Sequence, residues 1–360
     1  MFLYSCFAQL FSISILFYII YYIQVANFLR SELPVRLAHR ILDLDRVPLM
    51  RDMPSVQLVK GVYINSFVDL AQYDTILNNE EEAAFAEFLA RKYDAHSTVL
   101  IQMARGAYEL RQEIRLKRGS MSDAEKESSP EFSQLNDCHA FLDRFYMSRI
   151  GIRVLAGQYL ALREPPIPNY IGMICLKTSP YFLVKAVTRD ATQMCRKRYG
   201  EAPDVEINGR CDLTFCYIPS YLKYMLLELI KNAMRATIER HLYSDERLPP
   251  VRVIIADGTE NEDVVIKVAD AGGGISRSNM RKIWSYLYTT ADPSIQEDFI
   301  GASDHDPSSS PLAGLGFGLP ISRSYARYFH GDLDIMSMEG YGTDAYLHLA
   351  RMEDPSQKFS

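Results

Sequence analysis

The chain has 360 residues, of which 48% are apolar and 23% are charged. A chain of this length usually forms two domains, and its composition excludes a disordered, collagen-like or low-complexity protein. The formal net charge of −6 argues against a nucleic-acid partner held through its phosphates. The six cysteines form no CxxC pair, so neither a metal knuckle nor a disulfide framework is indicated.

Residues 1–29 contain no Asp, Glu, Lys, Arg or His. An apolar stretch of about 20 residues can span a bilayer. The basic region and cleavage site of a signal peptide are not evident, and neither is the Arg-rich pattern of a transit peptide. Three interpretations stay open: a membrane anchor, a buried helix, or an incorrectly assigned start of the gene. We expect residues 1–27 to form a separate apolar segment, and membrane contact through residues 1–29 stays an open alternative.

Residues 28–163 have the pattern of a four-helix-bundle-like domain. Apolar residues recur at helical spacing within 33–44 and 56–70. Asn79 followed by Glu82 resembles a capping box and predicts the start of a long helix that continues past Val99. The polar stretch 119–130 predicts an exposed loop, and 135–162 predicts a further long helix. Long helices joined by polar loops are typical of a bundle.

Pro165, Pro166 and Pro168 end this helical pattern, so we place a domain boundary between residues 163 and 164. Beyond it, strand-like and helix-like segments alternate. Strands are expected at 170–176, 213–217, 251–256, 264–269, 333–338 and 343–349, and helices at 180–199, 219–241 and 319–329. The alternation predicts an α/β sandwich with a mixed sheet over residues 164–360, and therefore an α+β chain.

The predicted helix 219–241 carries the most informative polar residues. Glu228, Asn232 and Arg235 project from one helical face. An asparagine oxygen can bind Mg²⁺, which takes phosphate oxygens and water as its other ligands. The row therefore indicates a phosphate and metal site, although taken alone it is also compatible with a solvated helix face.

Three glycine-rich motifs follow. Asp270 ends a predicted strand and precedes Gly272–Gly274, so its carboxylate could accept a hydrogen bond from an adenine amino group. Gly314–Pro320 has alternating glycines before a helix, whose first N–H groups suit phosphate. The acidic, serine-containing stretch 292–311 before it predicts a mobile lid. Gly340–Thr343 is a turn that enters the last strand.

The four motifs, in the order ExxKN, DxGGG, GxGxGLP and GxGT, resemble the GHKL (Bergerat) nucleotide-binding fold. Gyrase, the Hsp90 chaperones, histidine kinases and mitochondrial dehydrogenase kinases share this fold. Residues 31–38, 141–153 and 338–347 are similar to pyruvate dehydrogenase kinases, and most of all to the plant-type members. The resemblance extends from about Asn27 to Arg351.

This resemblance implies a serine kinase of the mitochondrial matrix that uses ATP and Mg²⁺. Such kinases phosphorylate and inactivate the α subunit of pyruvate dehydrogenase. The resemblance also implies the lipoyl domains of that complex as partners, and a homodimer. The target serine and the sensitivity to effectors stay open.

By the same resemblance, Glu228 is the general base and Asn232 is the Mg²⁺ ligand. Lys231 and Arg235 would lie near the phosphates, and Asp270 would read the adenine. The residues assigned to ATP binding are Lys231, Asn232, Arg235, Asp270, Gly272, Gly274, Tyr288, Thr289, Gly314, Leu315, Gly316, Phe317, Gly318, Leu319 and Thr343. Those matching an effector pocket for small acids are His96, Ser148, Arg149 and Arg153, for which helix-surface ion pairs are the alternative.

The sequence also departs from the family pattern. Tyr224 stands where many animal members have a histidine four residues before the glutamate. Trp284 is the only tryptophan, so we do not expect the Trp-bearing C-terminal tail of those members. The first alternative function is a branched-chain 2-oxoacid dehydrogenase kinase. A histidine kinase using His96, and a nucleotide-binding regulator without transfer activity, are more distant alternatives.

Overall fold

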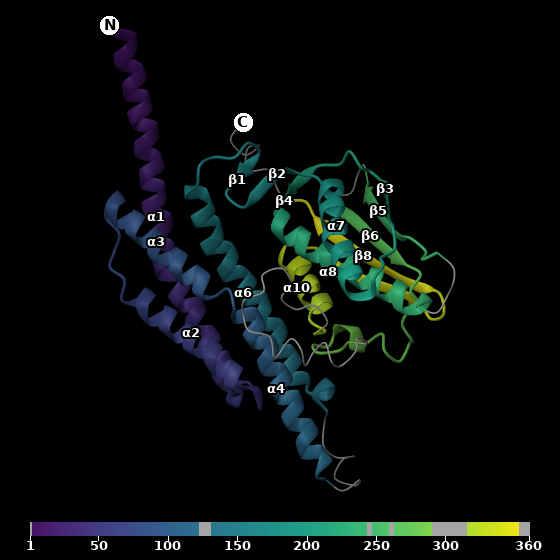
Figure 1. The fold of residues 1–360 in the computed structure, drawn as a ribbon. Coiled ribbons are helices and arrows are strands. Elements are labelled where there is room, and N and C mark those ends of the chain that lie inside the picture. Colours follow the sequence, from purple (N-terminus) through teal and green to yellow (C-terminus); the bar gives the residue numbers. More distant parts are fainter. Residues whose placement is uncertain (1, 122–130, 243–246, 259–262, 290–314, 353–360) are drawn as a thin grey trace. The chain divides into compact units, whose positions relative to one another are not determined.

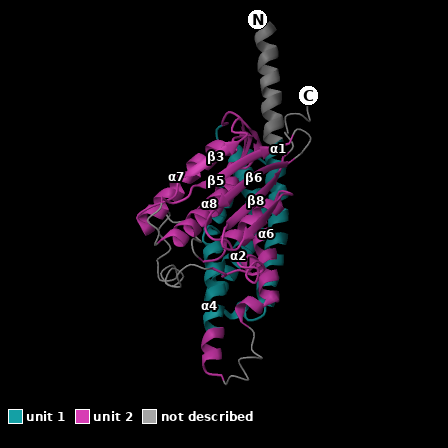
Figure 2. Cartoon of the chain, turned by 90° about the vertical axis from the view of Figure 1, so that its right-hand side faces the viewer, with its two compact units in different colours: residues 1–113, 148–165 teal, residues 114–147, 166–360 magenta. Residues whose placement is uncertain are grey.

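The computed structural model describes the backbone of residues 2–121, 131–242, 247–258, 263–289 and 315–352, and side chains from Tyr21 onward. These residues form a helical part followed by an α/β part with a mixed sheet, as the sequence predicts (Figure 1). The chain divides into two compact units (Figure 2). Unit 1 comprises residues 1–113 and 148–165, and unit 2 comprises residues 114–147 and 166–360. The expected domain limits after residues 27 and 163 stay predictions.

Unit 1 is built from long helices. These are α1 (Phe2–Arg46), α2 (Pro54–Ala71), α3 (Asn79–Ala95), the first part of α4 (Val99–Gly119) and the second part of α6 (Asn136–Arg163), with the short helix η1 (Met50–Asp52). Helix α1 packs against α2 and α3. Its buried residues Leu33, Leu37 and Leu44 recur at the spacing that brings side chains to one face of a helix.

The single helix expected from Asn79 to beyond Val99 is wrong in two respects. The capping residue is Asn78, whose side chain accepts the N–H of Glu81 at 3.0 Å, so the capping pair lies one residue earlier than expected. The helix also ends at residue 95, and α4 begins at Val99. At this break the carbonyl of His96 accepts a hydrogen bond from the Arg149 guanidinium at 2.8 Å. A tertiary hydrogen bond that the local pattern does not encode thus marks the end of α3.

Helix α1 runs through residue 27 without a break. The Tyr22 hydroxyl donates to the carbonyl of Leu162 at 2.7 Å, and Ala26 is fully buried. The Asn27 amide exchanges hydrogen bonds with the backbone of Ile76. Residues 22–29 therefore belong to the packed helices of unit 1. Within the described part of the chain, no helix combines the length and apolar character that crossing a bilayer requires.

Unit 2 contains a five-stranded sheet in the order β3-β5-β6-β8-β7. Its strands are β3 (Val205–Gly209), β5 (Val251–Asp257), β6 (Asp263–Asp270), β7 (Asp332–Met338) and β8 (Gly342–Ala350). The β3–β5 pair is parallel and the other pairs are antiparallel, which makes the sheet mixed. A smaller sheet contains β1 (Tyr170–Ile171), β2 (Ile174–Thr178) and β4 (Phe215–Tyr217).

Helices α7 (Pro180–Tyr199), α8 (Pro219–His241) and α10 (Gly318–Tyr328) accompany the large sheet (Figure 1). Unit 2 also contains the short helices η2 (Phe132–Gln134) and η3 (Lys282–Trp284), the end of α4 and the first part of α6. Pro219 opens α8, a position where the N–H that proline lacks is not needed. Gly200 ends α7 with φ 82°, as the sequence predicts. Buried residues of α8 and the inner face of the sheet share one apolar core, which fixes the orientation of the polar face of α8.

Candidate active site

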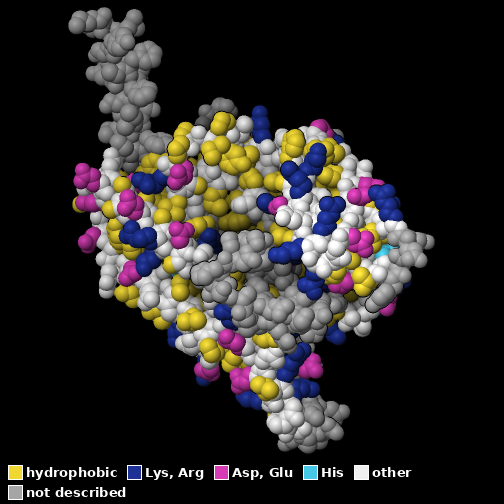
Figure 3. Space-filling model, in the orientation of Figure 1, with side chains coloured by type: hydrophobic (Ala, Val, Ile, Leu, Met, Phe, Trp, Pro, Cys, Tyr) yellow, Lys and Arg dark blue, Asp and Glu magenta, His cyan; other side chains and the backbone are white. Residues whose placement is uncertain are grey.

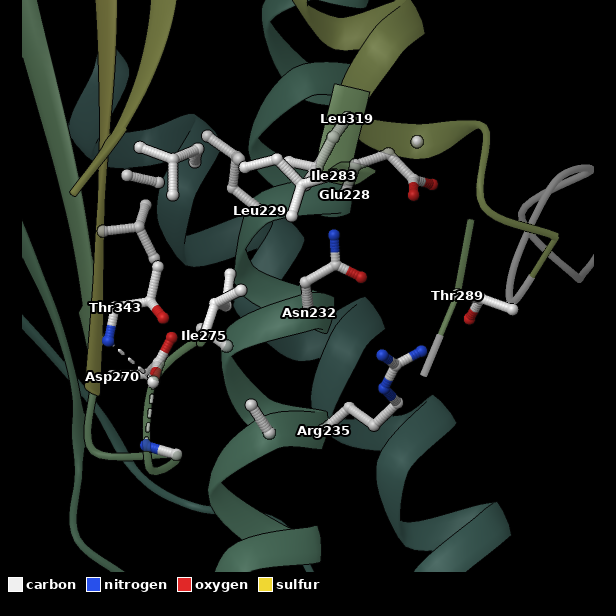
Figure 4. A pocket seen from close by; sticks show the side chains of 18 of the residues that line it. Glu228, Leu229, Asn232, Arg235, Asp270, Ile275, Ile283, Thr289, Leu319 and Thr343 are labelled. Carbon is white, nitrogen blue, oxygen red and sulfur yellow. Dashed lines mark hydrogen bonds between the residues drawn. The ribbon is translucent and has the colours of Figure 1, made fainter. Parts of the chain in front are cut away.

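Unit 2 contains a cavity of about 500 Å³ between α8, the ends of β6 and β8, the segment 274–289 and the start of α10 (Figure 4). This volume lies within the range of pockets that hold a cofactor or nucleotide. Glu228, Asn232 and Arg235 enter the cavity from α8, and Asp270 and Thr343 enter from the strands. The motif residues of the sequence therefore converge on one site, as their order predicts.

Asp270 lies at the end of β6, where the β6–β8 register places it opposite Thr343. Its Oδ1 accepts the backbone N–H of Gly272 at 2.8 Å and that of Thr343 at 3.2 Å. Burial raises the pKa of Asp270, and these two N–H groups oppose the shift. An ionised carboxylate accepts about four hydrogen bonds, so acceptor capacity remains for a ligand amino group.

Gly316 makes the closest backbone approach at the opposite wall. Its φ is +79°, and a Cβ at this position would lie 2.4 Å from the carbonyl oxygen of Tyr288. Only glycine fits such a contact with a left-handed backbone. Gly316 thus lets the backbone just before α10 pass close to Tyr288. Tyr288 and Thr289 also line the cavity.

Most of the residues assigned to ATP binding line this cavity: Asn232, Arg235, Asp270, Gly272, Gly274, Tyr288, Thr289, Gly316, Gly318, Leu319 and Thr343, together with Glu228. Leu315 and Phe317 are buried instead, and Phe317 packs against Tyr146 and Tyr286. Lys231 does not line the cavity, because its side chain turns to Glu228. Gly314 and the predicted lid at 292–311 lie outside the described residues.

Part of the lining was not predicted from the sequence. Ala236 and Arg240 continue the Glu228 and Asn232 row at steps of four, so helical spacing could have found them. Ile275, Ser276, Asn279 and Ile283 come from a segment with one short 3-10 helix and no regular strand. No periodic pattern in the sequence predicts that such residues line the cavity.

A second, smaller cavity lies within unit 1. It is lined by Leu33, Leu37, Tyr63, Ser66, Leu70, Leu89, Lys92, Tyr93, His96, Arg149, Ile152, Arg153 and Ala156. Three of the four predicted effector residues are thus brought together, whereas Ser148 does not line the cavity. Arg149 donates to the His96 carbonyl, and Arg153 donates to the Tyr93 carbonyl at 3.1 Å while stacking on the Tyr93 ring.

The imidazole of His96 is buried, with Nε2 2.9 Å from the Ser66 hydroxyl. Burial, followed by the charges of Arg149, Arg153 and Lys92, lowers the pKa of His96 to about 4. At neutral pH the pocket therefore combines a neutral imidazole with two arginines and with Lys92, whose ammonium pairs with Asp69. Such a set is suited to a small carboxylate.

Comparisons with known proteins agree with this arrangement. Residues 20–175 match the family model described as mitochondrial branched-chain alpha-ketoacid dehydrogenase kinase. Residues 218–352 match the histidine kinase-, DNA gyrase B- and HSP90-like ATPase. A pyruvate dehydrogenase (acetyl-transferring) kinase of Arabidopsis thaliana is 43% identical over 92% of this chain and 86% of its own length.

A kinase of the same name from Schizosaccharomyces pombe is 36% identical over 90% of this chain and 88% of its own length. The human pyruvate dehydrogenase kinase isozyme 4 is 36% identical over 91% of this chain and 77% of its own length. The chain belongs to the mitochondrial pyruvate dehydrogenase kinase family.

In this kinase, Glu228 has an aromatic neighbour on the same helix. Tyr224 lies one helical turn earlier on α8 and is partly buried, and its ring contacts that of Tyr325 at 5.3 Å between centroids. Burial, followed by the charge of Glu228, raises the pKa of Tyr224 well above its ordinary value. The position where many animal kinases have a histidine is therefore occupied here by a neutral phenol.

Proposed function

We propose that this protein is an ATP-dependent serine kinase that phosphorylates and inactivates the α subunit of pyruvate dehydrogenase in the mitochondrial matrix. The observation that carries the proposal is the presence of Glu228 and Asn232 in the cavity that also contains Asp270. A carboxylate base, a metal-binding amide and an adenine acceptor are the three groups that such a transfer needs.

In the proposed reaction Glu228 accepts the proton of the serine hydroxyl, and the serine oxygen forms a bond to the γ-phosphorus of ATP. The bond between the γ-phosphorus and the β,γ-bridging oxygen breaks, and ADP leaves. General-base catalysis of this kind contributes about 10²–10⁴-fold to a rate. Arg235, in the same row on α8, faces the cavity and is suited to the phosphates.

The lining also fits Mg²⁺. The described residues contain no cluster of three or more His, Cys, Asp or Glu side chains that could enclose a metal. Mg²⁺ commonly binds through one or two protein oxygens, with water and phosphate oxygens completing its six ligands. Asn232 would supply the protein oxygen, and the bound ion would neutralise charge on the phosphates.

We further propose that the cavity of unit 1 binds a small carboxylate effector such as pyruvate. Arg149 and Arg153 line this cavity together with a buried neutral His96. The same buried imidazole argues against a histidine kinase, because a phosphoacceptor must be reached by ATP and His96 is 8% exposed.

The proposed partners are the lipoyl domains of the dehydrogenase complex and a second copy of this chain. Met336 and Met338 on the edge strand β7 and Ile254 on β5 are exposed, and apolar groups of this kind suit a subunit interface. Charges of both signs are interspersed on the face shown in Figure 3. The dimer would be tested by comparing the sedimentation of the wild-type protein with that of the Met338→Glu variant.

A branched-chain 2-oxoacid dehydrogenase kinase is the second candidate, because the family model that matches residues 20–175 bears that name. Purified pyruvate and branched-chain dehydrogenases should be incubated side by side with the protein and ATP. We expect phosphoserine on the pyruvate enzyme and loss of its activity. Faster phosphorylation of the branched-chain enzyme would overturn the proposed substrate.

A further inference from the structure

Lys231 forms an ion pair with Glu228, one turn earlier on α8. Its Nζ lies 2.7 Å from Oε1 of Glu228, and only 14% of the lysine side chain and 3% of the glutamate side chain are exposed. Glu228 lines the nucleotide cavity whereas Lys231 does not. The lysine is therefore directed at the carboxylate and not at the space where phosphates would bind.

The other oxygen of the same carboxylate rests against α10. A Cβ on Gly318, the first residue of α10, would lie 2.2 Å from Oε2 of Glu228. The carboxylate thus has one oxygen bonded to Lys231 and the other packed against the start of a second helix. Two contacts from different directions limit the rotamers that Glu228 can adopt.

Tyr224 cannot take the place of Lys231 as a source of positive charge. Its hydroxyl is buried and makes no hydrogen bond within the described residues. It stays neutral at physiological pH, because burial, together with the charge of Glu228, raises its pKa. The charge-assisted hydrogen bond from the Lys231 ammonium fixes the position of the carboxylate oxygen that it binds.

We propose that Lys231 is a positioning residue that holds the Glu228 carboxylate in the orientation that faces the serine hydroxyl. This inference rests on the proposed function, since only transfer to a hydroxyl requires the base. It replaces the assignment of Lys231 to the phosphates and predicts the opposite kinetic result. A lysine that binds phosphate supports ATP affinity, whereas a lysine that holds the base supports turnover at saturating ATP.

The test compares Lys231→Met with Lys231→Arg in the full-length protein. ATP binding is measured by titration, and serine phosphorylation is measured at saturating ATP. We expect Lys231→Met to bind ATP within about threefold of wild type and to lower kcat by about 10- to 100-fold. Lys231→Arg should recover most of the turnover. The matched control is Lys223→Met, because Lys223 is a half-exposed lysine of α8 that pairs with Asp190; it should behave as wild type.

A double variant separates action through Glu228 from an independent effect. If Lys231 acts only through the base, Lys231→Met should slow the Glu228→Gln enzyme no further. The inference is overturned if Lys231→Met raises the Kd for ATP tenfold or more with an unchanged kcat, or if the two substitutions multiply. Full turnover by Glu228→Gln alone would instead refute the general base of the proposed function, so the two failures are distinguishable.

Discussion

The substitution Asp270→Asn should change which base the cavity prefers. The asparagine keeps a carbonyl oxygen for the N–H groups of Gly272 and Thr343, which Oδ1 of Asp270 now binds at 2.8 and 3.2 Å. It also brings an NH₂ group to the position of the second carboxylate oxygen. That NH₂ group cannot accept a hydrogen bond from the amino group of adenine, because both are donors. It can donate to the 6-oxo group of inosine triphosphate.

The magnitude follows from the hydrogen bond that is lost. A hydrogen bond to a charged group contributes about 1.5–3 kcal/mol, which corresponds to a roughly 10- to 150-fold weaker Kd for ATP. Affinity for inosine triphosphate should stay constant or rise. Both nucleotides are titrated into wild type, Asp270→Asn and the control Asp344→Asn. Asp344 is a nearby residue of β8, and its own carboxylate pairs with Lys267 at 2.6 Å. Equal losses for the two nucleotides in Asp270→Asn would refute adenine recognition by this residue.

Three further predictions concern the metal, the effector pocket and the first helix. Asn232→Ala should weaken ATP binding in the presence of Mg²⁺ and leave metal-free ATP binding unchanged, which nucleotide titrations at several Mg²⁺ concentrations would measure. His96 has a folded pKa of about 4 against an ordinary 6.5, so the stability it contributes is complete above pH 6.5 and is lost as the pH falls toward 4. Between pH 7 and pH 5, urea unfolding should show a loss about 2 kcal/mol larger in wild type than in His96→Gln; equal losses would contradict the buried neutral imidazole. Removal of residues 1–20 should preserve ATP binding and thermal stability, whereas removal up to residue 26 should preserve ATP binding but lower the melting temperature, because it deletes the Tyr22 hydrogen bond and buried Ala26.

Much of the fold follows from local chemistry in the sequence. The prolines after Arg163, the terminal Gly200 of α7 and Pro219 at the start of α8 act within a few residues of their own position. Strand β3 was not predicted, because Val205–Gly209 is a short edge strand defined by its parallel pairing with β5. The break after residue 95 was missed for a similar reason, since Arg149 comes from a distant part of the chain.

In the candidate site too, features set by local sequence could be predicted, whereas features set by packing could not. Glu228, Asn232 and Asp270 could be placed because helix period and strand ends determine where they project. The orientation of Lys231 could not, because its spacing on α8 is compatible with the phosphates as well as with Glu228, and side-chain packing decides between them. Ile275 and Asn279 were also beyond prediction, since they come from a segment without a repeating pattern.

In the proposed reaction, Glu228 accepts a proton from a serine of pyruvate dehydrogenase. The most direct measurement is the rate of phosphoserine formation on the α subunit at saturating ATP, by wild type and by Glu228→Gln. The amide preserves the shape of the side chain but cannot accept the proton, so we predict nearly unchanged ATP affinity and a rate lower by about 10²–10⁴-fold. Phosphate transfer by Glu228→Gln at the wild-type rate would contradict the role of Glu228 as the general base.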